Sequence, residues 1–107
     1  MIKKAVWVSF DLGVSGDYEG MYTWLANHGA LECGDSVALV QYEFKAKLLE
    51  ELKRDLAKTV ELRKKSRVYV IYRGEKGTAQ GRFLFGARKQ APWTGFGLSQ
   101  EVAPDEL

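Results

Sequence analysis

The sequence predicts an α+β fold in which two helices cover one face of an antiparallel sheet. Residues 4–11 alternate apolar and polar side chains, which is typical of a strand buried on one face. Residues 45–62 contain no Gly or Pro and carry apolar side chains at spacings of three and four, which is typical of an amphipathic helix. Similar alternating segments lie on both sides of that helix, so strands and helices are interleaved along the chain.

The first strand and the first helix follow from the N-terminal part of the chain. One face of the strand over residues 4–11 carries Val6, Val8 and Phe10, and the other carries Trp7, Ser9 and Asp11. A glycine-bearing loop follows, and Ser15 or Asp17 can cap the next helix. We expect this helix to run to about His28, because Gly29 can take the left-handed conformation that ends a helix.

The middle of the chain predicts a hairpin followed by the second helix. Residues 30–33 form a short strand, Gly34 and Asp35 a two-residue reversal, and residues 36–44 a longer strand rich in Val, Leu, Tyr and Phe. The apolar stripe of the helix over residues 45–62 consists of Leu49, Leu52, Leu56 and Val60.

A second hairpin closes the fold. Residues 67–73 alternate as a strand, GEKGT supplies a glycine-bearing turn, and residues 79–86 form the last strand. Regular pattern is lost beyond Arg88. We therefore expect a single domain over residues 1–89 and an irregular tail over residues 90–107 with a disordered end.

The expected order of elements is strand, helix, strand, strand, helix, strand, with one additional strand at the C-terminal end. This is the order of the ferredoxin-like plait (βαββαβ), in which both helices cover the same sheet face. The other face has no helix of its own and carries apolar side chains, so we expect a homodimer. We expect Trp7, Trp93 and Phe96 at this interface, with the tail aromatics covering the sheet of their own or of the partner copy.

Charge is distributed unevenly along the chain. Residues 63–89 carry nine cations against one acid, whereas residues 1–44 carry two cations against six acids. Cations up to residue 65 have acids three or four residues away, which indicates a solvated helix face. Beyond residue 65, cations alternate with aromatic side chains, as phosphate contact and base stacking require.

The basic C-terminal half therefore supplies the first functional interpretation. The expected nucleic-acid contacts are Arg67, Arg73, Lys76, Arg82, Arg88 and Lys89, and the interleaved aromatics are Tyr69, Tyr72, Phe83 and Phe85. We interpret the chain as a small dimeric binding module whose basic half engages a polyanion such as nucleic acid, or an acidic protein.

The order of elements, together with VWVSFDL ending a first strand in Asp11, resembles two related families of small plait proteins. These are the spacer-acquisition nuclease subunit of CRISPR systems and the antitoxin endoribonucleases of the GhoS type. The resemblance covers residues 4–86 as a pattern. It implies that Asp11 lies near a dimer axis and holds Mg²⁺, and that the strand over residues 79–86 packs on the partner subunit.

The resemblance thus gives an alternative function, a magnesium-dependent nuclease in which Asp11 is the catalytic and metal-binding residue. Without the resemblance, Asp11 is expected to accept backbone hydrogen bonds from the glycine turn that follows it. Both interpretations stay open at this point, and so does the question whether the protein is an enzyme.

Composition excludes several other classes of site. With a single Cys33 and a single His28, the chain has no internal disulfide and no zinc site built on Cys and His. His28, at the expected end of a helix, is suited to interact with the helix dipole. No cofactor is expected, apart from Mg²⁺ under the nuclease alternative. The chain shows no signal peptide and no run of 18 apolar residues, so we expect a cytoplasmic protein without membrane contact.

Overall fold

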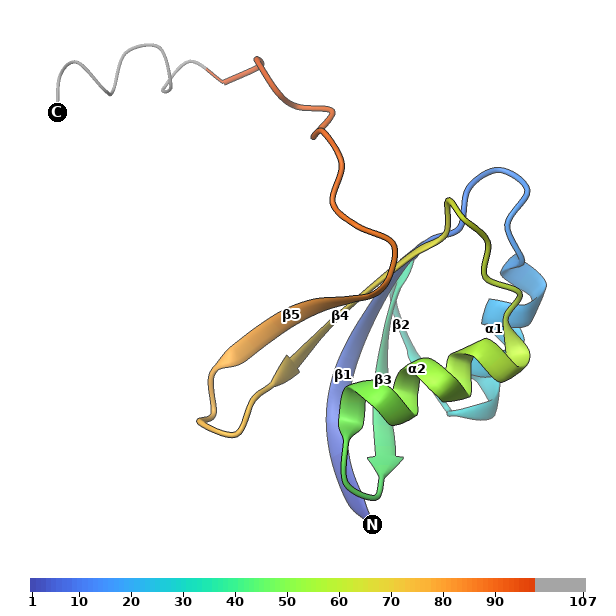
Figure 1. Ribbon diagram of the computed structural model, residues 1–107, viewed down its shortest axis with the longest axis vertical. Helices are drawn as coiled ribbons and strands as arrows, with labels where there is room; N and C mark the ends of the chain where they lie inside the picture. Colours follow the sequence, from blue (N-terminus) through green and yellow to red (C-terminus); the bar gives the residue numbers. More distant parts are fainter. Residues whose placement is uncertain (98–107) are drawn as a thin grey trace, which may run out of the picture.

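The chain folds into one five-stranded sheet with two helices, as a computed structural model shows (Figure 1). In chain order the elements are β1 (Ile2–Asp11), α1 (Tyr18–Asn27), β2 (Leu31–Gly34), β3 (Val37–Phe44), α2 (Leu48–Thr59), β4 (Arg67–Arg73) and β5 (Ala79–Phe85). The structure describes residues 1–97, and the predicted disordered end of the tail lies outside these residues. Within residues 90–97 the tail contains turns but no helix or strand.

The sheet has the strand order β2-β3-β1-β4-β5. The central strand β1 is antiparallel to both β3 and β4, and β5 extends the sheet by pairing antiparallel with β4. Both helices lie on the same side of the sheet (Figure 1). The predicted α+β class is therefore confirmed, and the strand order is compatible with a plait carrying one additional strand.

The hydrophobic core lies between the sheet and the two helices. In β1, Val6 and Val8 are fully buried, and their neighbours across the sheet, such as Val40 and Val70, are buried with them. From the helices, α1 contributes Met21 and Trp24, and α2 contributes Leu48, Leu52 and Leu56. The predicted face of β1 is thus the core face, because successive strand residues point to opposite sides of the sheet.

The ends of α1 follow the predicted signals. The carboxylate of Asp17 accepts a hydrogen bond from the Gly20 N–H at 2.9 Å and caps the helix. Gly29 has φ of +61° just beyond the helix. The Nδ1 atom of His28 lies 2.8 Å from the Trp24 carbonyl oxygen, so this ring occupies the C-terminal end of α1.

Three element boundaries differ from the prediction. Helix α2 is shorter than residues 45–62, because the Glu51 carboxylate accepts hydrogen bonds from the N–H groups of Lys45, Ala46 and Lys47 at 2.8–2.9 Å and holds them in a loop. The buried stripe consequently starts at Leu48, and Leu49 is half-buried. The first hairpin reverses at residues 35–36, because Gly34 still belongs to β2, where the register shifts. Strand β1 begins earlier than predicted, at Ile2.

The sheet surface opposite the helices is called the open face below. A row of apolar side chains crosses its centre from β2 to β4, formed by Leu31, Leu39, Trp7 and Ile71. Trp7 and Ile71 are each 42% exposed. Between residues 1 and 97, no helix reaches the length and apolar character that crossing a membrane requires.

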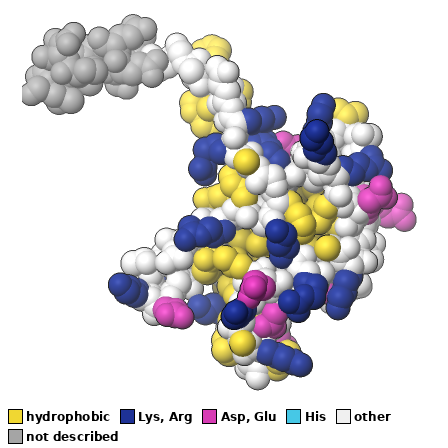
Figure 2. Space-filling model, viewed as in Figure 1, with side chains coloured by type: hydrophobic (Ala, Val, Ile, Leu, Met, Phe, Trp, Pro, Cys, Tyr) yellow, Lys and Arg dark blue, Asp and Glu magenta, His cyan; other side chains and the backbone are white. Residues whose placement is uncertain are grey.

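Beyond β5 the chain leaves the sheet and runs away from the domain (Figure 1). Hydrophobic side chains of this segment stand clear of the rest of the molecule in Figure 2. Trp93 is 72% exposed and Phe96 is 81% exposed, so neither aromatic packs on the sheet of its own chain.

Candidate nucleic-acid interface

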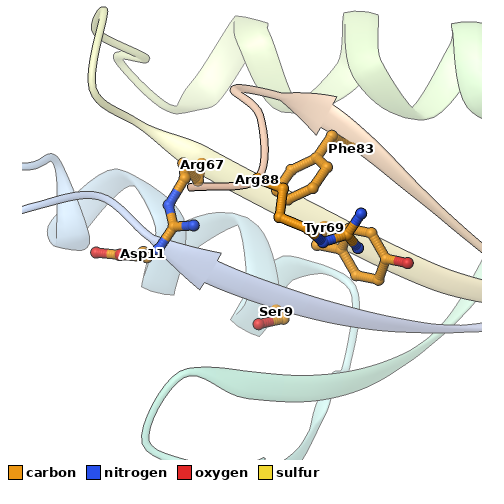
Figure 3. Close-up of a pocket in the computed structure, with 6 residues that line it drawn as sticks. All are labelled: Ser9, Asp11, Arg67, Tyr69, Phe83 and Arg88. Carbon is orange, nitrogen blue, oxygen red and sulfur yellow. Dashed lines mark hydrogen bonds and ion pairs between the residues drawn. The ribbon is translucent and has the colours of Figure 1, made fainter. Parts of the chain in front are cut away.

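A shallow hollow of about 240 Å³ lies at one end of the open face (Figure 3). Its lining comes from β1, β4, β5 and the segment after β5, and comprises Ser9, Asp11, Arg67, Tyr69, Phe83 and Arg88. The sheet register brings these side chains together, because Tyr69 lies opposite Ser9 on one side and opposite Phe83 on the other. Residues paired across neighbouring strands share a face of the sheet.

Two aromatic rings form the floor of the hollow. The ring centroids of Tyr69 and Phe83 are 4.8 Å apart at an interplanar angle of 67°, an edge-to-face contact. Gly81 makes room for this arrangement. A Cβ atom at position 81 would lie 2.6 Å from Cζ of Tyr69, which is too close for the ring to stay in place.

Arg88 returns to the open face and covers both rings. Its guanidinium carbon lies 5.8 Å from the Tyr69 centroid and 5.6 Å from the Phe83 centroid, within the range of cation–π contacts. The return depends on a turn at Gly86, which has φ of +79° and packs tightly against the backbone of Ser66 and Arg67. A residue with a side chain would be strained there.

Asp11 and Arg67 form an ion pair at the rim of the hollow. The Arg67 Nη2 atom lies 2.7 Å from the Asp11 Oδ2 atom, and the Gly13 N–H donates to Asp11 Oδ1 at 3.3 Å. The hydrogen bond from Arg67 is the main reason that the pKa of Asp11 is lowered, with smaller help from the Gly13 N–H and from the charge of Lys89. Asp11 is therefore an ionised acceptor, and the expected hydrogen bond to the glycine turn is present.

Residue periodicity does not indicate the Asp11–Arg67 pair, but the expected topology does. Asp11 is the last residue of β1 and Arg67 is the first residue of β4. Antiparallel neighbours place the end of one strand beside the start of the other, so the plait topology alone brings the two charges together. Arg67 is one of the predicted nucleic-acid contacts, and part of its charge is neutralised by Asp11 within the chain.

The six predicted cation contacts lie at four places in the structure. Arg67, Arg88 and Lys89 lie at the hollow. Arg73 lies at the opposite end of the open face, and Lys76 lies in the turn between β4 and β5. Arg82 is paired with the buried Val70 and so points to the helix side of the sheet. Arg82 and the hollow thus lie on opposite faces of the sheet, because Arg82 is adjacent to Phe83 in β5 and successive strand residues point to opposite sides.

The interleaved aromatics also divide between the two faces. Tyr69 and Phe83 lie on the open face, whereas Tyr72 is buried in the core. Phe85 changes face because Leu84 is an extra residue in β5, where the register against β4 shifts. The ring of Phe85 faces the helices, with the Lys53 Nζ atom 5.3 Å from its centroid.

Asp11 is the one carboxylate in the lining of this hollow. Among residues 1–97 no group of three or more His, Cys, Asp or Glu side chains is placed to hold a metal ion. Asp11, the predicted catalytic and magnesium-binding residue, has Arg67 as its nearest charged neighbour. A magnesium site at Asp11 would therefore need a second carboxylate from another copy of the chain, as in the nuclease alternative.

No family model, no curated protein and no solved structure matches the chain. The function must therefore be inferred from the residues of this chain, above all from the cation and the aromatic rings at the hollow.

Proposed function

We propose that this protein is a small, dimeric, non-catalytic module that binds single-stranded nucleic acid on the open face of its sheet. The observation that carries the proposal is the position of Arg88 over the Tyr69 and Phe83 rings in an uncovered hollow. Bases stack on aromatic rings whatever their sequence, and an arginine beside the rings supplies both a stacking plane and a phosphate contact.

The charges around the hollow favour a polyanion. Two residues separate Arg88 and Lys89 from the end of β5, and Arg73 extends the positive charge to the other end of the open face. Arg67 is held by Asp11, so the proposal assigns phosphate contacts to Arg73, Arg88 and Lys89. Three such contacts on a single strand predict a slope of about −2 for log K against log salt concentration, since each contributes about −0.7.

A direct binding measurement tests this proposal. Fluorescence anisotropy with a labelled uridine oligonucleotide of about 12 nucleotides covers the site sizes of comparable binding surfaces. We expect affinity to fall steeply between about 50 and 200 mM salt. Replacing Tyr69 with Leu keeps an apolar side chain but removes the stacking plane, and should cost about 1–3 kcal/mol of binding free energy.

Arg88→Ala has a matched control on the other side of the molecule. Arg54 is an exposed arginine on α2, so Arg54→Ala removes the same charge from the helix side. Arg88→Ala should weaken binding and reduce the salt slope by about 0.7, whereas Arg54→Ala should leave both nearly unchanged. Equal effects of the two variants would show that binding follows net charge only and would refute the assignment to the open face.

The same assay separates the rival functions. Absent or salt-insensitive binding of the oligonucleotide would refute the proposal and leave an acidic protein as the partner of the basic half. Cleavage of the oligonucleotide in Mg²⁺ that disappears in Asp11→Ala would instead establish the nuclease alternative. That alternative draws on the ionised state of Asp11 at the rim of the hollow, and it requires two Asp11 carboxylates within about 10 Å of each other in the dimer.

A further inference from the structure

The segment after Arg88, residues 90–97, is called the C-terminal arm. The arm carries no charged residue and contains Trp93 and Phe96, both largely exposed. Two backbone hydrogen bonds give it a defined local shape, from Thr94 N–H to the Ala91 carbonyl at 3.1 Å and from Phe96 N–H to the Trp93 carbonyl at 3.0 Å. An uncharged, locally ordered segment with two exposed aromatics has the composition of an interface anchor.

A second feature complements the arm. A groove of about 500 Å³ lies on the open face at the end opposite the hollow, with a floor of Ala5, Trp7, Ile71 and Ala79 and a rim that includes Lys3 and Arg73. Its volume is within the range of about 300–1,000 Å³ that ligand sites occupy. The floor accepts an aromatic ring, and Lys3 at the rim can lie against the ring face, which leaves Arg73 for the phosphate contact.

Charge also matches arm to groove. The arm brings no cation toward Lys3 and Arg73, and the acids that follow it in the sequence are Glu101, Asp105 and Glu106, with no Lys or Arg beyond residue 97. A segment of opposite charge next to the arm favours approach to a basic rim, because complementary charges steer association.

We propose that the arm of one copy docks in the groove of a second copy, and that the second copy returns the same contact. Arm and groove belong to the same chain, yet the arm runs away from its own sheet (Figure 1). The arm aromatics are largely exposed, and Trp7 and Ile71 on the groove floor are exposed as well. Two complementary surfaces on one chain form a closed dimer when the contact is exchanged about a two-fold axis. The inference takes up the dimeric state of the proposed function and assigns it a contact.

The exchanged contact has the size that a stable dimer needs. Four aromatic side chains, two from each arm, bury about 200 Å² each when fully covered. Adding a similar area from the two grooves gives a total of about 1,600 Å², which is the standard size of a specific protein interface.

The mass of the full chain in solution tests the inference. Light scattering and sedimentation should give twice the 12.1 kDa of one chain. The double variant Trp93→Ala/Phe96→Ala and the groove variant Trp7→Ala should each raise the dimer dissociation constant by roughly 30-fold or more, as expected for buried aromatic anchors. Val14→Ala is the control, because Val14 is a fully exposed apolar residue in the loop before α1 and should leave the mass unchanged.

Mixing the two variants distinguishes a dimer held by exchanged arms from a dimer held by other contacts. The Trp7→Ala chain has an intact arm and the Trp93→Ala/Phe96→Ala chain has an intact groove, so a mixture should recover part of the dimer through one contact per pair. A dimer that survives loss of the arm aromatics, or a mixture without recovery, would overturn the arm exchange. A wild-type chain that is monomeric would overturn it too. Oligonucleotide affinity measured on the same samples tells this failure apart from failure of the binding function.

Discussion

Gly81 is the position where the smallest change should remove the proposed binding site and leave the fold intact. Gly81 lies in β5 under the Tyr69 ring, and its backbone is not left-handed, so alanine is compatible with the strand. A Cβ atom at position 81 would lie 2.6 Å from Cζ and 2.9 Å from Cε2 of Tyr69. Tyr69 is on the open face, where its ring can rotate outward to avoid the overlap. We therefore expect Gly81→Ala to separate Tyr69 from Phe83 and from Arg88.

The magnitudes for stability and for binding differ. Loss of the edge-to-face contact costs about 0.5–1.5 kcal/mol of unfolding free energy. Replacing Gly by Ala at a compatible position raises the unfolding free energy by about 0.4–1 kcal/mol, because it reduces the conformational entropy of the unfolded chain. The net change in stability should thus be within about 1 kcal/mol, whereas loss of a stacking plane should cost about 1–3 kcal/mol of oligonucleotide binding.

Urea unfolding and anisotropy on the same preparation measure the two quantities. The control is Gly81→Ala in a Tyr69→Leu background, where the overlapping ring atoms are absent. In that background Gly81→Ala should leave binding unchanged. Full oligonucleotide affinity in the single variant, or an equal loss in both backgrounds, would refute the role assigned to the Tyr69 ring.

Three further predictions concern the core, the loop before α2 and the ion pair at the rim of the hollow. Leu56 is fully buried, so Leu56→Ala should lower the unfolding free energy by about 2–5 kcal/mol in urea unfolding; a smaller loss would show that the core can collapse around the site. Three backbone N–H groups lower the pKa of Glu51 from 4.5 to about 2, so its stabilisation is complete above pH 4.5 and is lost as the pH falls toward 2. Glu51→Gln should therefore be less stable than the wild type at pH 7 and should lose less stability between pH 4.5 and pH 2. If the unfolding free energies of the two proteins changed in parallel with pH, the loop contact would be contradicted. The Asp11 side chain is 53% exposed, so a double-mutant cycle with Arg67 should give a coupling of only about 0.2–1 kcal/mol that declines with salt, and a larger value would indicate a drier site.

The fold could be predicted because its signals are local and periodic. The alternation in β1 and the leucine spacing in α2 each identify an element and its buried side, and the order of elements then limits the topology. Boundaries were less accurate where a side chain captures backbone groups. At Glu51 the carboxylate holds three N–H groups in a loop that the leucine spacing alone would extend as helix.

The candidate site was only partly predictable because it depends on irregular features. Alternation places Tyr69 and Phe83 on one face, but an added residue at Leu84 moves Phe85 to the other. The position of Arg88 depends on a turn at Gly86. A glycine in the sequence indicates a turn but does not predict the direction of the chain after it. Register shifts and turns are set by the packing of particular side chains, for which periodicity gives no signal.

The residues that stabilise the fold differ from the residues of the open face to which we assign binding and dimerisation. The buried hydrophobic core is formed by the helix side of the sheet and by the helices, including Val6, Val8, Leu52 and Leu56. The aromatic side chains of the open face lie outside that core. They therefore contribute little to the free energy of folding, although they expose apolar surface to water. Exposed aromatic and apolar side chains invite association, and a monomer without a partner on this face would lose solubility for no gain in stability. Because the two sets of residues hardly overlap, substitutions on the open face should change binding or dimer mass at nearly constant stability. If Trp7→Ala or Tyr69→Leu instead unfolded the domain, the open face would be part of the core of a larger assembly and the separation argued here would fail.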